Sequence, residues 1–185
     1  MAIRLLRRKH WWSSLSQDWK SALRDNLELV DHSEEEILTQ LAGLTDLDLS
    51  GTDITDLSPL LYLPQLEILD ISHTHITEFT PIQSLQNLKG LHACFLPSFH
   101  LPLLNYLPEL EILDISYPDQ KVGNPPDLSH LSNLRELYLN SCGCTNVTAF
   151  VGCDQLEVLC LHYNQIPLEE IMALRELMQE CKVMV

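Results

Sequence analysis

The sequence lacks long apolar stretches. Its apolar runs are only a few residues long, far short of the roughly 20 residues that a membrane-spanning helix needs, so no membrane span is predicted. The first residues, MAIRLLRRKHWWSSLS, are basic but contain no apolar segment of about 7–15 residues, which argues against a signal peptide. We therefore expect a cytoplasmic protein.

Glycine is also scarce, with 6 residues, and the 10 prolines are spread along the chain rather than gathered in one segment. This distribution gives no sign of a flexible linker between two domains. A chain of 185 residues with 45% apolar side chains is long enough for one sizeable core. We therefore predict a single domain over residues 1–185.

The sequence motifs of common enzyme classes are missing. No GxSxG, HExxH, P-loop or Cys–His arrangement is present, although the catalytic serines, zinc ions and phosphate sites of many enzymes need these residues at these spacings. We therefore expect a protein that is not an enzyme and that needs no cofactor.

Basic side chains are few. The chain carries 11 Lys and Arg against 26 Asp and Glu, a formal net charge of −15. Residues 1–24 hold six basic side chains and one acidic side chain, net +5, whereas the rest of the chain holds five basic and 25 acidic side chains, net −20. An acidic body repels phosphate backbones, which argues against nucleic acid as a ligand, and it attracts partners that have a basic face.

What the sequence does contain is a repeat with a period of about 22 residues, clearest over LTDLDLSGTDITDLSPLLYLPQLEILDISHTHI at residues 44–76. Five positions recur at this interval: Leu44, Leu47, Leu49, Thr52 and Ile54 return as Leu66, Leu69, Ile71, Thr74 and Ile76. Six strands are expected to open, one period apart, at Leu44, Leu66, Leu88, Leu110, Leu134 and Leu156. Only the step from Leu110 to Leu134 is longer, by two positions. A fixed period of this length built on LxxLxLxx(N/T/C)xL is typical of leucine-rich repeats.

The phrases LTDLDLSGTDITDLSPL and LEILDISHTHI resemble the 22-residue leucine-rich repeats of bacterial internalins and of eukaryotic phosphatase-regulatory proteins. The resemblance covers residues 38–166. It implies an α/β solenoid with a curved parallel β-sheet on the concave side, short 3₁₀ turns on the convex side, and a protein partner bound on the concave sheet. Internalins carry secretion signals and wall anchors, which we do not expect here, so their extracellular role is not implied.

Helical caps are predicted at both ends, so that six repeats at residues 44–166 lie between an N-terminal cap at 1–43 and a C-terminal cap at 167–185. Ser16 precedes a helical apolar pattern that runs to residue 30, and Ser33 with Glu36 has the spacing of a capping box. Pro167 is expected to be the first residue of a C-terminal helix whose apolar stripe lies within residues 168–180. One apolar stripe is expected on that helix, from Leu168 to Met178, and a short edge strand is expected in the final CKVMV.

Alternation along each strand places every second side chain on the concave face, and three outward columns follow from the repeat. The first contains Asp46, Ile68, Gly90, Ile112, Glu136 and Val158; the second Asp48, Asp70, His92, Asp114, Tyr138 and Cys160; the third Ser50, Ser72, Cys94, Ser116, Asn140 and His162. Phe95, Tyr117 and Tyr163 follow their strands at equivalent places.

Ile68, Gly90 and Ile112 form an apolar strip on consecutive strands. We predict that a partner contacts this face, since an apolar strip with aromatic and acidic borders is typical of protein contact sites. Two alternatives remain: the apolar side chains pack against their own sheet, and the carboxylates are simply solvated. The predicted contact residues are Asp46, Asp48, Ile68, Asp70, His92, Phe95, Ile112, Asp114, Tyr117, Glu136, Tyr138, His162 and Tyr163.

The six cysteines are expected to be reduced and structural. Cys142, Cys144 and Cys153 fall at interior positions of the repeat, where a free thiol behaves as a small apolar residue. Cys94 and Cys160 belong to strands three rungs apart, roughly 14 Å, which is too far for a disulfide.

Three functions are compared. The first is a non-catalytic scaffold that binds a protein or peptide on the acidic concave sheet, and we favour it. The second is an inhibitor or regulatory subunit whose acidic surface covers the basic active site of an enzyme. The third is a metal-dependent hydrolase using Asp70, His92 and Asp114, but a flat sheet has little means of excluding water. His73 and His75 in SHTHI raise a second metal hypothesis, and the ordinary interpretation is an exposed loop without metal.

Overall fold

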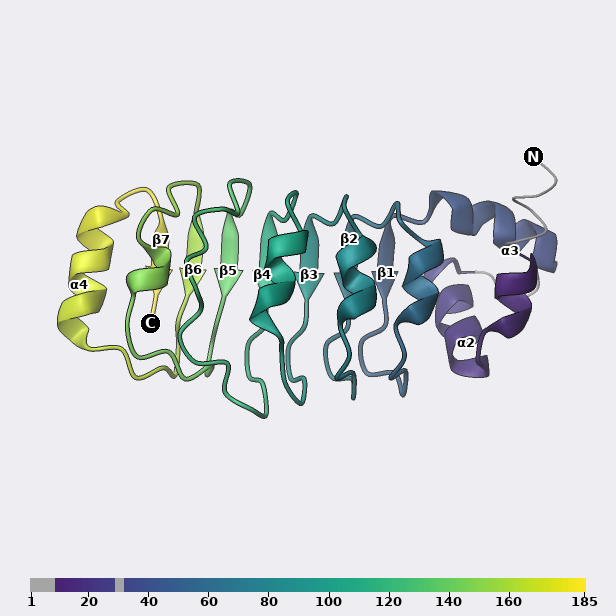
Figure 1. Cartoon of the computed structure of the whole chain (residues 1–185), viewed down its shortest axis with the longest axis horizontal. Coiled ribbons are helices and arrows are strands. Elements are labelled where there is room, and N and C mark those ends of the chain that lie inside the picture. Colours follow the sequence, from purple (N-terminus) through teal and green to yellow (C-terminus); the bar gives the residue numbers. More distant parts are fainter. Residues whose placement is uncertain (1–8, 29–31) are drawn as a thin grey trace.

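The structure is a computed structural model that describes residues 9–28 and 32–185. Seven strands lie side by side in one parallel sheet, in sequence order, and helices stand at both ends of the row (Figure 1). The strands are β1 (Asp46–Asp48), β2 (Ile68–Asp70), β3 (Gly90–His92), β4 (Ile112–Asp114), β5 (Glu136–Tyr138), β6 (Val158–Cys160) and β7 (Lys182–Met184). The predicted solenoid is confirmed, and so is the edge strand expected near the C-terminus.

The strands pair in the register that the repeat predicts. Leu47 pairs with Leu69 and Leu69 with Leu91, so that one leucine per strand stacks on the next. These leucines are buried, and the alternate residues of β1, Asp46 and Asp48, are exposed. Burial of the stacked leucines between neighbouring strands therefore holds the row together.

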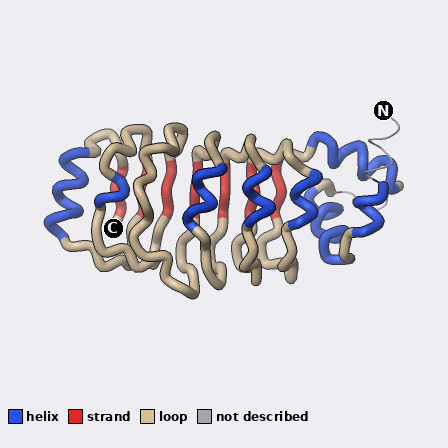
Figure 2. Tube along the Cα trace, viewed as in Figure 1, coloured by secondary structure: helices blue, strands red, loops and turns tan. Residues whose placement is uncertain are grey.

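The other side of the molecule carries short 3₁₀ helices (Figure 2). They are η2 (Ser58–Tyr62), η3 (Thr80–Ser84), η4 (Leu101–Tyr106) and η5 (Thr148–Phe150). A proline stands in the first turn of η2, η3 and η4, where its fixed φ suits a helical start and its missing N–H costs nothing. The prediction of short 3₁₀ turns is confirmed.

The N-terminal cap contains a helical segment over residues 9–14, α2 (Gln17–Asn26), α3 (Glu34–Gln40) and η1 (Leu41–Gly43). The predicted N-caps are formed: the Ser16 side chain accepts the backbone N–H of Trp19, and Ser33 forms a capping box with Glu36.

The helix α2 ends at Asn26, earlier than the predicted residue 30, because Glu28 adopts a left-handed φ of 54°. The end of the prediction, at residues 29 and 30, lies outside the described residues. So do the basic residues Arg4, Arg7 and Arg8.

The C-terminal cap is α4 (Leu168–Leu177). Ile171 and Leu174 are buried, whereas the first and last residues, Leu168 and Leu177, are 68% and 70% exposed. Three of the five residues of the predicted stripe therefore pack on the core, because Met178 just after the helix is also partly buried against it. Leu168 and Leu177 project into solvent.

The start of this cap differs from the prediction. Pro167 is the N-cap of α4 rather than its first helical residue, because its ψ of 142° is extended. At the outer edge of β7, Arg175 Nη2 donates a hydrogen bond of 3.0 Å to the carbonyl oxygen of Val183. This contact occupies a backbone acceptor that an edge strand otherwise leaves open.

Candidate functional site

The polar row that the repeat predicts on the sheet is formed. Asp48, Asp70, His92 and Asp114 occupy matching positions on β1 to β4. Asp48 is exposed, and the other three side chains are half-buried. We refer to the side of the sheet that carries this row as the sheet face.

The three aspartates of this row also shape the backbone. In each of them Oδ1 accepts a hydrogen bond from the backbone N–H two residues further on, a local contact that favours a turn. The bonds join Asp48 to Ser50 at 2.7 Å, Asp70 to Ser72 at 2.8 Å and Asp114 to Ser116 at 2.9 Å. One oxygen of each carboxylate thus has a structural role, while Oδ2 has no hydrogen-bond partner within the described residues.

Four residues predicted to point outward are buried instead: Ser72, Gly90, Ser116 and Cys160. Ser72 and Ser116 each accept, through the side-chain hydroxyl, the backbone N–H of the next strand, from Cys94 and Asn140 at 3.1 Å. Cys160, on β6, is only 4% exposed. At Ser72 and Ser116 the third column is therefore a polar seam within the sheet, because a short hydroxyl satisfies a backbone donor there, whereas Ser50 is exposed and His162 is half-buried.

The apolar strip lies on β2 to β4. Ile68 is 40% exposed and Ile112 is half-buried, with Gly90 between them. A Cβ atom placed on Gly90 would contact Cγ1 and Cγ2 of Ile68 at 3.5 Å, so the isoleucine leans over the glycine. An alanine side chain would therefore fit at Gly90, in ordinary contact with Ile68.

A residue in the left-handed conformation follows every one of the first six strands, three positions after the strand ends. These residues are Gly51, His73, Phe95, Tyr117, Ser141 and Tyr163, with φ between 54° and 66°. Only the first is glycine, the residue that adopts this conformation without strain. For the other five the backbone conformation costs of order 1 kcal/mol each.

Four of these residues form a stack of rings, which we call the aromatic column: His73, Phe95, Tyr117 and Tyr163. The ring centroids of His73 and Phe95 are 4.3 Å apart and those of Phe95 and Tyr117 4.9 Å apart, with interplanar angles of 13° and 10°. Tyr163 continues the column at 6.4 Å from Tyr117, past the small Ser141.

Much of the aromatic column is open to solvent, with Phe95 47% and Tyr163 80% exposed. The sequence prediction included Phe95, Tyr117 and Tyr163 but assigned His73 only to a metal hypothesis. The available signal was its spacing, because His73 precedes Phe95 by one repeat length.

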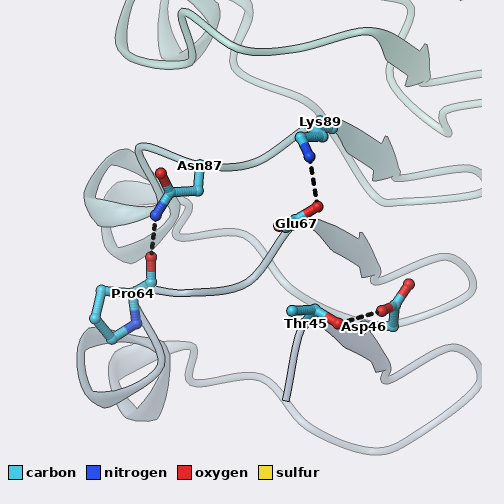
Figure 3. A network of polar contacts seen from close by, with 6 residues as sticks. All are labelled: Thr45, Asp46, Pro64, Glu67, Asn87 and Lys89. Atoms are coloured by element: carbon cyan, nitrogen blue, oxygen red, sulfur yellow. Dashed lines mark hydrogen bonds and ion pairs between the residues drawn. The ribbon is translucent and has the colours of Figure 1, made fainter. Parts of the chain in front are cut away.

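The remaining predicted contact residues are partly engaged with one another. Tyr138 Oη donates a 2.7 Å hydrogen bond to Glu136 Oε2, and this bond, with burial, raises the pKa of Tyr138 to about 12. His162 lies beside Tyr163, with ring centroids 6.2 Å apart. Asp46 accepts a hydrogen bond from Thr45 Oγ1 at 2.6 Å (Figure 3).

Two basic side chains next to the first residues of strands form ion pairs. Lys89 Nζ lies 2.6 Å from Glu67 Oε2 (Figure 3), and the hydrogen bond to this carboxylate raises the pKa of Lys89. Arg135 pairs with Glu157 two strands further on. Neither of these ion pairs, the two found within the described residues, involves an aspartate of the polar row.

The described part of the chain contains no group of three His, Cys, Asp or Glu side chains arranged to hold a metal ion. The metal-dependent hydrolase considered above therefore has no candidate metal site among the described residues. All six cysteines are free thiols. Burial raises the pKa of Cys142 to about 12 and that of Cys144 to about 11, so both remain protonated, unreactive thiols at neutral pH.

Comparisons with known proteins identify the family of these repeats. Residues 42–87 match the family model for leucine-rich repeats, in two copies. No curated protein matches the sequence at a significant level.

Several solved structures are similar. A leucine-rich-repeat protein of Leptospira interrogans has a TM-score of 0.66 at 23% identity, over 80% of this chain and 39% of that one. Internalin C2 of Listeria monocytogenes has a TM-score of 0.71 at 19% identity, over 89% of this chain and 71% of that one. Internalin F of the same organism has a TM-score of 0.62 at 23% identity, over 91% and 55%.

The chain thus spans less than two thirds of the Leptospira protein and of internalin F. None of the helices in the described ranges combines the length and the apolar character that crossing a membrane requires. The parallel sheet in the register of the repeat, the 3₁₀ turns opposite it and these matches together show that the protein is a leucine-rich-repeat solenoid.

Proposed function

We propose that the protein is a non-catalytic scaffold that binds a protein or peptide with a basic face, and that it does so in the cytoplasm. The partner lies along the sheet face and against the aromatic column. The observation that carries this proposal is the aromatic column itself, a stack of partly exposed rings beside a row of carboxylates on the same strands.

One feature supports a basic partner, and a second supports binding at the aromatic column. An arginine side chain stacks its planar guanidinium on an aromatic ring and pairs with a carboxylate at the same time, and Phe95 and Tyr117 lie next to the strands of His92 and Asp114. The chain also places rings at strained positions where glycine would cost less. Large aromatic side chains at an exposed surface are characteristic of binding hot spots.

Capture of partners from the native host tests this proposal. The wild-type protein is compared with a Phe95→Ala/Tyr117→Ala variant and with an Ile68→Glu variant, each checked by circular dichroism. The proposal expects a protein that the wild type retains and both variants lose. Equal capture by all three proteins would remove the sheet face and the aromatic column from the account.

A further inference from the structure

A second candidate site lies at the N-terminal end of the molecule, in a cleft between the N-terminal cap and the first repeat. The cleft has a volume of about 460 Å³. Its walls come from residues 11–19 of the cap and from residues 53–62 of the first repeat, including η2. It contains none of the residues predicted to contact a partner on the sheet face.

One wall of this cleft is aromatic and apolar. The rings of Trp11 and Tyr62 are stacked with centroids 5.5 Å apart and an interplanar angle of 23°. Tyr62 is 50% exposed and its neighbour Leu61 is 55% exposed, so the mouth of the cleft presents apolar side chains to solvent. Trp19 is fixed below, since its Nε1 donates a 2.9 Å hydrogen bond to the Asp56 carbonyl oxygen.

Several polar groups of the cleft have no partner. Within residues 9–28 and 32–185, one buried side-chain nitrogen or oxygen lacks a hydrogen bond, and it is Trp11 Nε1. Buried donors without an acceptor are uncommon in native structures and call for an explanation. The carboxylates of Asp18 and Asp53 also have no hydrogen-bond or ion-pair partner in the described part of the chain, whereas the carboxylate of Asp56 accepts from the N–H and Oγ of Ser58.

We propose that this cleft binds an arginine or lysine side chain of a peptide. Among the described residues, no Lys, Arg or His lines the cleft, so a cation meets carboxylates, aromatic rings and neutral side chains there. The aliphatic part of the side chain packs on Tyr62 and Leu61, and its charge lies near Asp18 and Asp53, an arrangement that combines cation–π attraction with ion pairing. Trp11 Nε1 is buried, so it donates to a carbonyl of the same peptide only where that carbonyl reaches the Trp11 ring inside the cleft. This site does not depend on the proposed function of the sheet face.

Intrinsic tryptophan fluorescence tests the proposal at this end of the molecule alone, because all three tryptophans, Trp11, Trp12 and Trp19, belong to the N-terminal cap. The probe is a blocked hexapeptide of alternating leucine and arginine, and the controls replace its arginines by glutamine or by glutamate. We expect a saturable change in emission with the arginine peptide and none with the glutamate peptide. In a nitrogen–proton NMR spectrum the indole signal of Trp11 should move and that of Trp19, already bonded to Asp56, should stay.

Two charge-matched variants separate this cleft from a general loss of negative charge. The variant D18N/D53N should bind the arginine peptide at least tenfold more weakly, while E169Q/E180Q, which removes the same charge from exposed positions of the C-terminal cap, should bind like the wild type. Y62A, which keeps the charges, should also weaken binding, and the thermal melt of each variant shows whether it folds. Equal binding by D18N/D53N, or equal affinity for the glutamine peptide, would overturn the proposal.

Discussion

The side-chain amide of Asn26 stands in for a missing strand beside Asp48. Asn26 Oδ1 accepts the backbone N–H of Asp48 and Asn26 Nδ2 donates to its carbonyl oxygen, both at 2.7 Å. Asn26 precedes Asp48 by one repeat length. A single amide of the cap thus continues the hydrogen bonding of the sheet past its first strand and closes an edge that would otherwise be open.

The variant Asn26→Ala leaves a backbone donor and a backbone acceptor of β1 without these partners. We expect a loss of about 1–2 kcal/mol in the free energy of unfolding, measured by urea denaturation. Asn87→Ala is a matched control, because Asn87 Nδ2 makes one exposed bond of 3.1 Å, to the Pro64 carbonyl oxygen (Figure 3). An equal loss in both variants would show that Asn26 has no special role at the edge.

The aromatic column contributes to stability mainly at its centre. Phe95 stacks on His73 and Tyr117, whereas Tyr163 is 80% exposed and lies at the end of the column. Phe95→Ala should therefore cost about 1–3 kcal/mol and Tyr163→Ala less than about 1 kcal/mol. Urea denaturation of both variants measures the difference, and a reversed order would contradict the stacked arrangement.

Two leucines that differ in burial allow the stability contributions of the core and of the C-terminal cap to be compared. Leu113 on β4 is fully buried, whereas Leu168 at the start of α4 is 68% exposed. We expect Leu113→Ala to cost about 2–5 kcal/mol and Leu168→Ala to stay within about 0.5 kcal/mol of the wild type. Thermal and urea unfolding measure both values. A large loss in the second variant would mean that the end of α4 packs on the core after all.

The buried thiols predict a dependence of stability on alkaline pH. Burial raises the pKa of Cys142 from 9.0 to about 12, so the folded thiol keeps its proton where the unfolded one loses it. Because the folded state then binds more protons, the free energy of unfolding should fall as pH rises from about 9 to 12. Cys142→Ala should reduce that fall, as measured by urea unfolding at several pH values. An unchanged slope in this variant would place the cause in other groups.

The fold was predictable from the sequence because burial fixes the spacing of its residues. A leucine such as Leu69 stacks on Leu91 only if the repeat keeps its length, so the constant interval between leucines records the contact directly. The capping box at Ser33 was predictable for the same kind of reason, since its partner is three residues away.

Other parts of the molecule left little trace in the sequence. The bond from Asn26 to Asp48 depends on where a helix ends, which the spacing of the leucines does not record. Ser72 is buried because its hydroxyl accepts a backbone N–H of the neighbouring strand. The left-handed turn of His73 had one sign in the sequence. Gly51 stands at the equivalent position of the first repeat, and glycine favours a positive φ.

The central claim, that a partner lies along the sheet face and the aromatic column, is tested most directly by NMR mapping of the complex with a captured partner. The account predicts that backbone signals of β2, β3 and β4, together with those of Phe95 and Tyr117, shift or broaden on binding. Changes confined to η3 and η4 on the opposite side, with the sheet signals unmoved, would contradict it.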